Sequence, residues 1–313
     1  MFVFSIFMMM LLANNPAPGT LVDVGGFKLH AQVMGSGEPT VVLLAGAGNW
    51  SSYWALVQPA LAKHTRVVSY DSQGTGWSDF GPADRGLNQD AYELAQLLKG
   101  LKIDGPLILV GHSLGGLVAH TFAVRYPERV RGVVFVDSST PDLHLNFRDG
   151  DTFKWDLYRN KAKGKPLPPI QEKRLSPQNV TETKSDRDPG DLSMFSAEVQ
   201  GHFRAIFARS RKDVLKQKDW VADELAEMHA HPEQFKLGSL PVRVMSGDAK
   251  DRYSENMPER VLWHEQATAY LMGLSTKSHL ISVKKSGHNI HLDEPELVVN
   301  TVLSLFRELS PAK

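Results

Sequence analysis

One short stretch constrains the fold more than any other part of the chain. The apolar residues 107–110 (LILV) lead directly into the pentapeptide GHSLG of residues 111–115. A continuous apolar run of this kind is typical of a strand buried on both faces of a parallel sheet. Residues 114–126 then have the pattern of a helix, which Pro127 ends. The sequence therefore predicts a strand, a sharp turn and a helix, with Ser113 at the turn.

The two glycines of this turn explain how a serine can be held there. Gly111 and Gly115 flank Ser113 at two-residue spacing and carry no Cβ that would clash where strand and helix pass close together. Gly-x-Ser-x-Gly between a strand and a helix is the pattern of a nucleophile elbow. The alternative is an ordinary turn with an incidental serine, but the flanking strand and helix favour the elbow. We predict that Ser113 is a nucleophile.

Strand-like and helix-like segments alternate over most of the chain, which predicts a mostly parallel sheet with helices on both faces. Strands are expected at residues 21–24, 27–33, 40–45, 66–71, 107–110, 132–137, 241–246 and 279–284. Helices are expected at residues 53–63, 88–101, 114–126, 259–274 and 295–309. In such sheets ligands bind beyond the carboxyl ends of the strands. We expect residues 20–140 and 239–313 to form this core.

Two segments lie outside the expected core. Residues 141–238 are rich in charge and proline and lack strand-like runs, which predicts an inserted helical cap. Its large apolar residues could line a substrate pocket or form a small core of the cap itself; they are Phe153, Trp155, Tyr158, Met194, Phe195, Phe203, Phe207, Trp220 and Met228. Residues 1–19 form an apolar arm and a linker. The arm is too short to span a bilayer, and it is either a secretory signal, an arm over the active-site mouth or the product of an upstream start codon.

Composition excludes several classes of function. Lys and Arg together number 35, as do Asp and Glu, so the balance favours neither nucleic acid nor an anionic membrane as a partner. The chain has no cysteine, which rules out disulfides, thiolate metal sites and cysteine nucleophiles. His229 and His231 are spaced for different faces of a helix, so we expect no zinc site. Gly74-x-Gly76 is not a dinucleotide-binding motif.

A serine nucleophile needs a base, and His288 is the best placed one. It follows the last predicted strand in Ser286-Gly287-His288, just before a helix. A base in that position can take the hydroxyl proton of Ser113. His291 is the rival, and we interpret it as a structural histidine.

A histidine base needs a carboxylate to fix its tautomer, and three aspartates follow strand ends. Asp137 ends the apolar strand at residues 132–137, whereas Asp248 and Asp251 follow the strand at residues 241–246. At the position where a Gly-x-x-Asp pattern would put the acid, the chain has Lys250. We favour Asp137 as the acid, with Asp248 and Asp251 as alternatives; Asp137 could also simply cap its own loop.

The oxyanion formed on an attacked carbonyl must be received by backbone N–H groups. Leu114 directly follows the nucleophile at the start of a helix, so its N–H is the first expected donor. The second should come from the small residues Gly46-Ala47-Gly48, and we choose Ala47. The alternative is a glycine-rich turn without catalytic meaning.

With these residues in view, the chain resembles an α/β-hydrolase fold serine hydrolase. The resemblance depends on residues 111–116, on the loop SYDSQGTGWSD of residues 69–79, and on Ser286-Gly287-His288 followed by Leu292-Asp293-Glu294-Pro295. It implies an eight-stranded core, a variable cap over the site, and no metal or organic cofactor. The residues before the oxyanion loop, Ala45-Gly46, depart from the His-Gly common in the family. Some members place the acid after the preceding strand, where Asp137 lies.

These observations predict an enzyme that cleaves small-molecule carboxylic esters through an acyl-enzyme. Ser113 would attack, His288 would move the proton, Asp137 would orient His288, and the amides of Leu114 and Ala47 would hold the oxyanion. Lactonase, amidase, carbon–carbon bond hydrolase and cofactor-free haloperoxidase activities need the same triad and stay open. A ligand-binding protein without turnover is the second alternative. The location is either cytoplasmic or, if the first 13 residues act as a signal peptide, secreted or periplasmic.

Overall fold

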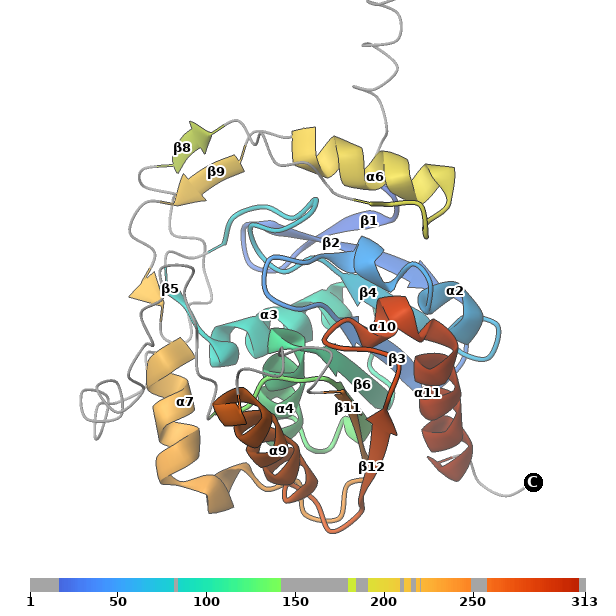
Figure 1. The fold of residues 1–313 in the computed structure, drawn as a ribbon. Coiled ribbons are helices and arrows are strands. Elements are labelled where there is room, and N and C mark those ends of the chain that lie inside the picture. Colours follow the sequence, from blue (N-terminus) through green and yellow to red (C-terminus); the bar gives the residue numbers. More distant parts are fainter. Residues whose placement is uncertain are drawn as a thin grey trace, which may run out of the picture.

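A mostly parallel sheet of eight strands forms the centre of the computed structural model (Figure 1). The model describes residues 17–81, 84–141, 180–183, 191–208, 211–214, 218–219, 221–248 and 258–309. The spatial order of the strands is β1-β2-β4-β3-β6-β7-β11-β12. Only β2 runs against its two neighbours, β1 and β4; every other pair is parallel. The strands are β1 (Thr20–Asp23), β2 (Lys28–Met34), β3 (Thr40–Leu44), β4 (Val67–Tyr70), β6 (Leu107–His112), β7 (Val130–Val136), β11 (Val242–Gly247) and β12 (Ser278–Val283).

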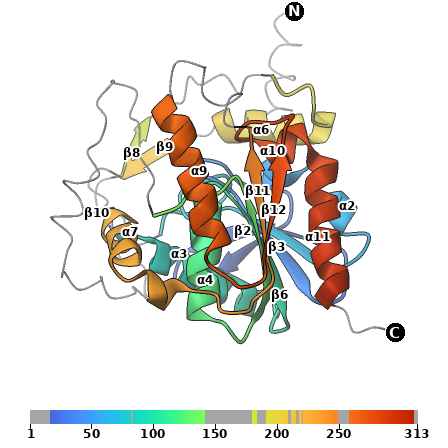
Figure 2. The same ribbon diagram turned by 60° about the horizontal axis from the view of Figure 1, so that its bottom comes forward.

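Helices cover both faces of this sheet, as the sequence predicts. Viewed along the sheet, α3, α4 and α9 lie on one side and α2 and α11 on the other (Figure 2). Both layers follow the predicted segments closely, although the segment at residues 53–63 forms two short pieces instead of one helix. The core helices are η1 (Ser51–Trp54), α2 (Gln58–Leu61), α3 (Leu87–Gly100), α4 (Leu114–Arg125), α9 (Pro258–Met272), α10 (Ile290–Asp293) and α11 (Pro295–Leu309).

Side chains of the central strands divide between two apolar cores, one on each face of the sheet. In β6, Leu107 and Leu109 point into the core that includes α3 and α4. Ile108 and Val110 point into the core that includes α2 and α11. Successive residues of a strand face opposite sides, so a strand buried on both faces must be apolar throughout. This explains the continuous apolar run that precedes Ser113.

The segment between β7 and β11 contains short strands as well as helices. Its described elements are β8 (Val180–Thr183), α6 (Ala197–Ala208), β9 (Arg211–Val214), β10 (Lys218–Asp219), α7 (Val221–Ala230) and η2 (Pro232–Phe235). Helices α6 and α7 are present in the segment predicted to be a helical insertion, and the prediction did not include the short strands. They are two to four residues long and have at most one apolar residue each, so no apolar run identifies them. β10 pairs with β5 (Asp84–Arg85), a short strand that precedes α3.

Aromatic residues in and just before α6 pack against Trp50 of the core as well as against one another. Phe203 and Phe207 lie 5.1 and 5.5 Å, centroid to centroid, from Trp50, and Phe195 stacks on Phe203 at 5.0 Å. Trp50 directly follows the predicted oxyanion loop and is 2% exposed. These residues therefore form a joint core between the insertion and the loop region. Phe153, Trp155, Tyr158 and Trp220 lie outside the described residues, as do residues 1–16.

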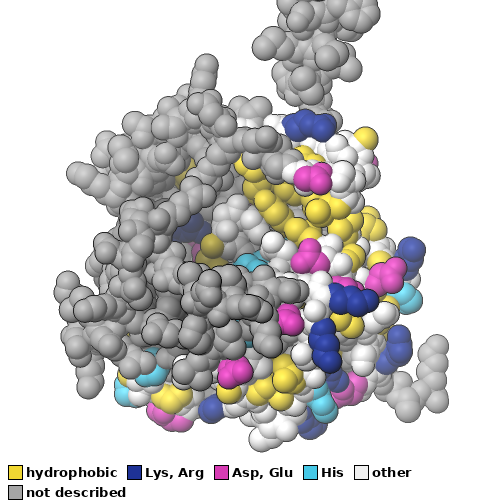
Figure 3. Space-filling model, viewed as in Figure 1, with side chains coloured by type: hydrophobic (Ala, Val, Ile, Leu, Met, Phe, Trp, Pro, Cys, Tyr) yellow, Lys and Arg dark blue, Asp and Glu magenta, His cyan; other side chains and the backbone are white. Residues whose placement is uncertain are grey.

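The distribution of charged side chains on the surface and the length of the described helices are relevant to possible partners. In the view of Figure 3, acidic and basic side chains are intermixed on the lower right of the face, while hydrophobic side chains gather nearer to α6. This mixture agrees with the equal numbers of acidic and basic residues in the whole chain. Among the helices that the structure describes, none is long and apolar enough to cross a membrane. The division of the chain into arm, core and cap stays a prediction.

Candidate active site

The backbone at Ser113 has the strained conformation expected of a nucleophile elbow. Its φ and ψ are 52° and −123°, between the last residue of β6 and the first of α4. A non-glycine residue at positive φ costs about 1–3 kcal/mol, so the surrounding structure must hold it there. Hydrogen bonds on both sides do so: the N–H of Gly116 and the N–H of Ser139 each donate to the carbonyl of Ser113, both at 3.0 Å.

Glycines at this turn let the chain pass within contact of itself. A Cβ built on Gly111 would lie 2.5 Å from the carbonyl oxygen of Gly115. A Cβ on Gly115 would lie 2.4 Å from the carbonyl oxygen of Leu44, at the end of β3. Neither backbone contact can give way as a flexible side chain would. The two glycines therefore set how closely α4 approaches β6 and β3.

Asp137 and His288 are in direct contact. Nδ1 of His288 lies 2.7 Å from Oδ2 of Asp137. A carboxylate can only accept, so Nδ1 carries the proton and donates it, which leaves the Nε2 lone pair free to act as a base. The Asp137 side chain is 3% exposed and that of His288 is 31% exposed. This arrangement is what a histidine base and its orienting carboxylate require.

The loop that carries Asp137 is fastened to the elbow. The Oγ–H of Ser138 donates to the carbonyl of Gly111 at 2.8 Å. The N–H of Asp137 donates to the carbonyl of Met245 in β11, also at 2.8 Å. Asp137 itself has a φ of 42°. Two strained residues, Ser113 and Asp137, thus stand at the carboxyl ends of neighbouring strands, tied to each other by the residues beside them.

His288 reaches the elbow through a backbone contact. Nε2 of His112, the residue before Ser113, lies 2.9 Å from the carbonyl oxygen of His288. The two imidazole rings are 4.5 Å apart, centroid to centroid. His288 therefore lies against the residue that precedes the predicted nucleophile, even though it follows the last strand of the sheet.

Of the other sequence candidates, His291 is buried away from solvent. It is 1% exposed, and its ring lies 4.7 Å from the ring of Trp54 and 4.3 Å from that of His112. Burial, with smaller effects of His112 and His288, holds the pKa of His291 well below its usual range. A neutral, enclosed imidazole fits the structural interpretation of His291.

The two alternative acids occupy different positions. The N–H of Asp248 donates to the carbonyl of Ser286 at 2.8 Å, which joins the end of β11 to the segment that carries His288. Asp251 lies outside the described residues. Contact with Nδ1 of His288 is observed for the carboxylate of Asp137. Between the two described candidates, the geometry thus favours Asp137 over Asp248.

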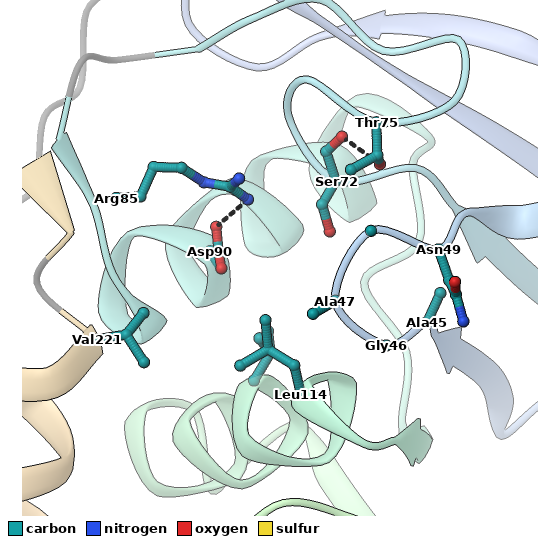
Figure 4. Close-up of a pocket in the computed structure, with 12 residues that line it drawn as sticks. Ala45, Gly46, Ala47, Asn49, Ser72, Thr75, Arg85, Asp90, Leu114 and Val221 are labelled. Carbon is teal, nitrogen blue, oxygen red and sulfur yellow. Dashed lines mark hydrogen bonds and ion pairs between the residues drawn. The ribbon is translucent and has the colours of Figure 1, made fainter. Parts of the chain in front are cut away.

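A pocket of about 310 Å³ opens beside the elbow. Ala47 and Leu114, the two predicted oxyanion donors, both line it and face its interior (Figure 4). Gly46 closes the loop onto the elbow, since a Cβ built there would lie 3.1 Å from Cβ of Ser113. The loop after β3 and the start of α4 therefore meet at the wall of one pocket.

One wall of this pocket is charged, which the sequence did not lead us to expect. Arg85 from β5 and Asp90 from α3 line it, with a guanidinium nitrogen 4.0 Å from a carboxylate oxygen (Figure 4). The Arg85 side chain is 32% exposed and that of Asp90 is 9% exposed. An arginine just before a predicted helix belongs to no motif, so nothing in the sequence pattern indicates this position for it.

A second histidine touches the carboxylate of Asp137, again without a sequence signal. Nε2 of His264 in α9 lies 3.1 Å from Oδ1 of Asp137. The N–H of Gly247 donates to the same oxygen at 3.1 Å. No motif marks His264, because the contact joins residues 127 positions apart.

Metal ligands can be assessed for the described residues. Within the described ranges, no group of three or more His, Asp or Glu side chains is placed to hold a metal ion. The His229–His231 pair sits at the end of α7 and in the loop that follows, and His231 lies 3.8 Å from Glu227 and from Glu233.

Comparison with known proteins places these features in context. A family model described as the alpha/beta hydrolase fold matches residues 39–295. The chain is 36% identical over 131 residues to a 2-hydroxymuconate semialdehyde hydrolase of Pseudomonas sp. strain CF600, covering 40% of this chain and 45% of that one. It is 27% identical over 282 residues to a putative carbamate hydrolase of Enterobacter cloacae, covering 88% of this chain and 96% of that one. The alignment spans less than half of the first relative's length.

Solved structures show the same fold at low identity. A thermophilic esterase from Thermogutta terrifontis superposes with a TM-score of 0.59 at 19% identity, covering 93% of this chain and 98% of that one. An N-acyl homoserine lactone degrading enzyme superposes with a TM-score of 0.62, also at 19% identity, covering 91% and 99%. At this identity the likeness concerns the fold.

Proposed function

Because the chain belongs to the α/β-hydrolase fold family, we propose that it is a serine hydrolase that cleaves carboxylic esters through an acyl-enzyme. The observation that carries this proposal is the 2.7 Å contact between Nδ1 of His288 and Oδ2 of Asp137, beside a serine held at positive φ. A buried carboxylate on Nδ1 and a side chain that is 31% exposed are what a histidine base requires.

The proposed reaction has two halves. Oγ of Ser113 attacks the ester carbonyl carbon while Nε2 of His288 takes the hydroxyl proton. The carbonyl oxygen becomes an oxyanion, which the N–H groups of Leu114 and Ala47 receive. The C–O bond to the alcohol then breaks, and His288 protonates the departing oxygen. Water repeats the sequence on the acyl-enzyme, releasing the acid and restoring Ser113.

Asp137 has a defined part in both halves. When His288 gains a proton, the imidazolium forms next to the Asp137 carboxylate, whose charge stabilises it. The carboxylate also keeps the proton on Nδ1, so that Nε2 has the lone pair that a base needs. Its near-complete burial strengthens this interaction, since water does not screen it.

A second candidate function is favoured by the charged wall of the pocket. Arg85 could pair with a substrate carboxylate at the end away from the oxyanion donors. Two similar proteins are a 2-hydroxymuconate semialdehyde hydrolase and a 2-hydroxy-6-oxo-2,4-heptadienoate hydrolase, whose names denote carboxylate-bearing compounds. The same triad would then cleave a carbon–carbon bond next to a ketone. Lactones and amides are further substrates that this arrangement fits.

Hydrolysis of short-chain p-nitrophenyl esters tests the proposal. Wild-type protein should show a burst of p-nitrophenol followed by steady turnover, and Ser113→Ala should lose both, with kcat falling by about 10⁴-fold or more. A lactone, an anilide and a dienoate with a 6-keto group, assayed in parallel, rank the substrate classes. If wild type turns over none of them and no acyl group is captured on Ser113, the ligand-binding alternative replaces this proposal.

A further inference from the structure

The carboxylate of Asp137 is held by histidines on two sides. His288 contacts Oδ2, while Nε2 of His264 lies 3.1 Å from Oδ1. His264 belongs to α9, and His288 belongs to the loop after β12. The side chains of His264 and Asp137 are 10% and 3% exposed, so this second contact is shielded from solvent.

The contact assigns a proton to His264. A carboxylate oxygen only accepts, so Nε2 of His264 carries hydrogen and donates it to Oδ1. The N–H of Gly247 is the other donor to that oxygen, at 3.1 Å. The hydroxyl of Ser246 is a weaker competitor for the imidazole, because its Oγ lies 3.5 Å from Nε2. Asp137 is the main partner of this histidine nitrogen.

Water is a poor substitute for this donor. A cavity of only about 10 Å³ lies next to the contact, and its walls include Val244, Ala267 and Leu271. A space of that size holds one water molecule at most. A buried carboxylate that loses a donor pays the desolvation of its charge without replacement. Removal of the His264 N–H would therefore leave Oδ1 with Gly247 alone among these donors.

We propose that His264 is a positioning residue that acts on His288 through Asp137. Its N–H fixes the carboxylate plane so that Oδ2 meets Nδ1 of His288, and it withdraws part of the carboxylate's charge from His288. No proton moves to or from His264 in the reaction. This inference rests on the proposed function, since it gives the Asp137–His288 pair its catalytic meaning.

The position of His264 separates binding from chemistry. It lines the small cavity behind Asp137 and is not one of the residues that line the 310 Å³ pocket beside the elbow. Substrate binding should therefore be insensitive to it. Among the described residues, His112 from β6 and His291 from α10 are further titratable groups near the Asp137–His288 pair, and both lie on the His288 side.

Two substitutions of His264 test the proposal on a p-nitrophenyl ester. His264→Phe removes the donor while keeping a ring of similar size, and kcat should fall about 10- to 100-fold with KM unchanged, as expected for loss of a charge-assisted hydrogen bond. The full carboxylate charge then faces His288, so the acidic limb of kcat/KM should move to higher pH. His264→Gln keeps an N–H near the Nε2 position and should restore kcat to within about threefold of wild type.

His120→Phe is the matched control for loss of a buried histidine. Nε2 of His120 contacts the carbonyl of Phe235 at 2.7 Å, and burial lowers the pKa of His120 to about 4, so His120 is a neutral, enclosed donor. Its removal should reduce the melting temperature without moving the acidic limb. A shift in His264→Phe but not in His120→Phe supports the proposal; equal limbs in wild type and His264→Phe, with kcat unchanged, overturn it.

A spectroscopic readout keeps this test separate from that of the proposed function. The proton between His288 and Asp137 should give a low-field proton resonance in the wild-type protein, which His288→Ala abolishes. In His264→Phe this resonance should change its position, and in His264→Gln it should return towards the wild-type value. If wild type hydrolyses nothing, the proposed function fails while the resonance still reports on His264. An unchanged resonance in a folded His264→Phe protein refutes the positioning role.

Discussion

Nδ1 of His288 lies 2.7 Å from Oδ2 of Asp137, although 151 positions separate the two residues in the chain. Asp137 directly follows β7 in the interior of the sheet, and His288 follows β12 at its edge. β11 lies between these two strands. The N–H of its last residue, Gly247, donates to Oδ1, the other carboxylate oxygen of Asp137. The acid thus reaches the base across a strand.

Substitution Asp137→Asn should reduce kcat on an active ester by about 10⁴-fold, because an amide at this place can donate to Nδ1 and so stabilise the wrong tautomer of His288. KM should change little, since Asp137 does not line the 310 Å³ pocket. Steady-state kinetics with circular dichroism to verify folding make the measurement.

Asp248→Asn is the control for this prediction. Asp248 occupies the next strand end, and its backbone N–H contacts Ser286, which an asparagine would retain. Its kcat should stay near that of wild type. A nearly neutral Asp137→Asn together with an inactive Asp248→Asn would transfer the role of the acid to Asp248.

The sequence alone predicts those residues whose type and structural setting both follow from the residues next to them. Ser113 follows a run that is apolar because β6 is buried on both faces, and Gly111 and Gly115 are required by backbone contacts. Asp137 was favoured since it ends a buried strand, and the parallel order of the sheet brings such ends together. The expected contact between Asp137 and His288 is present in the structure.

What the sequence left out depends on contacts without a local pattern. His264 lies on the buried side of α9. A histidine at such a position does not by itself indicate a functional role. Arg85 reaches the pocket from β5, a two-residue strand that exists only because β10 of the insertion pairs with it. Such features follow from how distant segments pack, and no spacing within one segment announces them.

The loop after β3 offers a test that separates activity from stability. A Cβ on Gly46 would lie 3.0 Å from Nδ1 of His112 and 3.1 Å from Cβ of Ser113, so Gly46→Ala should displace the elbow and lower kcat by about 10-fold. Gly48 has a φ of 73° and nothing within 4 Å of its Cβ position. Gly48→Ala should therefore destabilise the fold by about 1–2 kcal/mol through backbone strain. Melting curves and kcat are measured for both variants. If kcat were lower in Gly48→Ala than in Gly46→Ala, the argument from the contacts of Gly46 would be contradicted.

Arg85 should select for substrates that carry a carboxylate. Arg85→Met removes the guanidinium from the pocket and should raise KM for an ester with a distal carboxylate by about 10- to 100-fold, the loss of one charge-assisted hydrogen bond. The neutral ester of the same length is the matched substrate, and its KM should hardly change. Equal effects on the two substrates would show that Arg85 acts on the shape of the pocket and not on substrate charge.

Glu93 should make the stability of the fold fall as pH rises. Its side chain is 2% exposed, and the amide groups of Gln73 and Gln89 donate to Oε1 at 3.1 and 2.9 Å. Burial, reinforced by the charge of Asp90, raises the pKa of Glu93 from 4.5 to about 8. The folded chain therefore keeps a proton that the unfolded chain releases above pH 4.5. This contribution to stability is complete below pH 4.5 and is lost between there and about pH 8, at up to ~1.4 kcal/mol per pH unit.

Glu93→Gln retains the acceptor oxygen without the titration, and its melting temperature should exceed that of wild type more at pH 8.5 than at pH 5.5. Glu128→Gln, at an exposed position, should show no such dependence. A melting-temperature difference between Glu93→Gln and wild type that is the same at both pH values would mean that Glu93 is ionised in the folded protein.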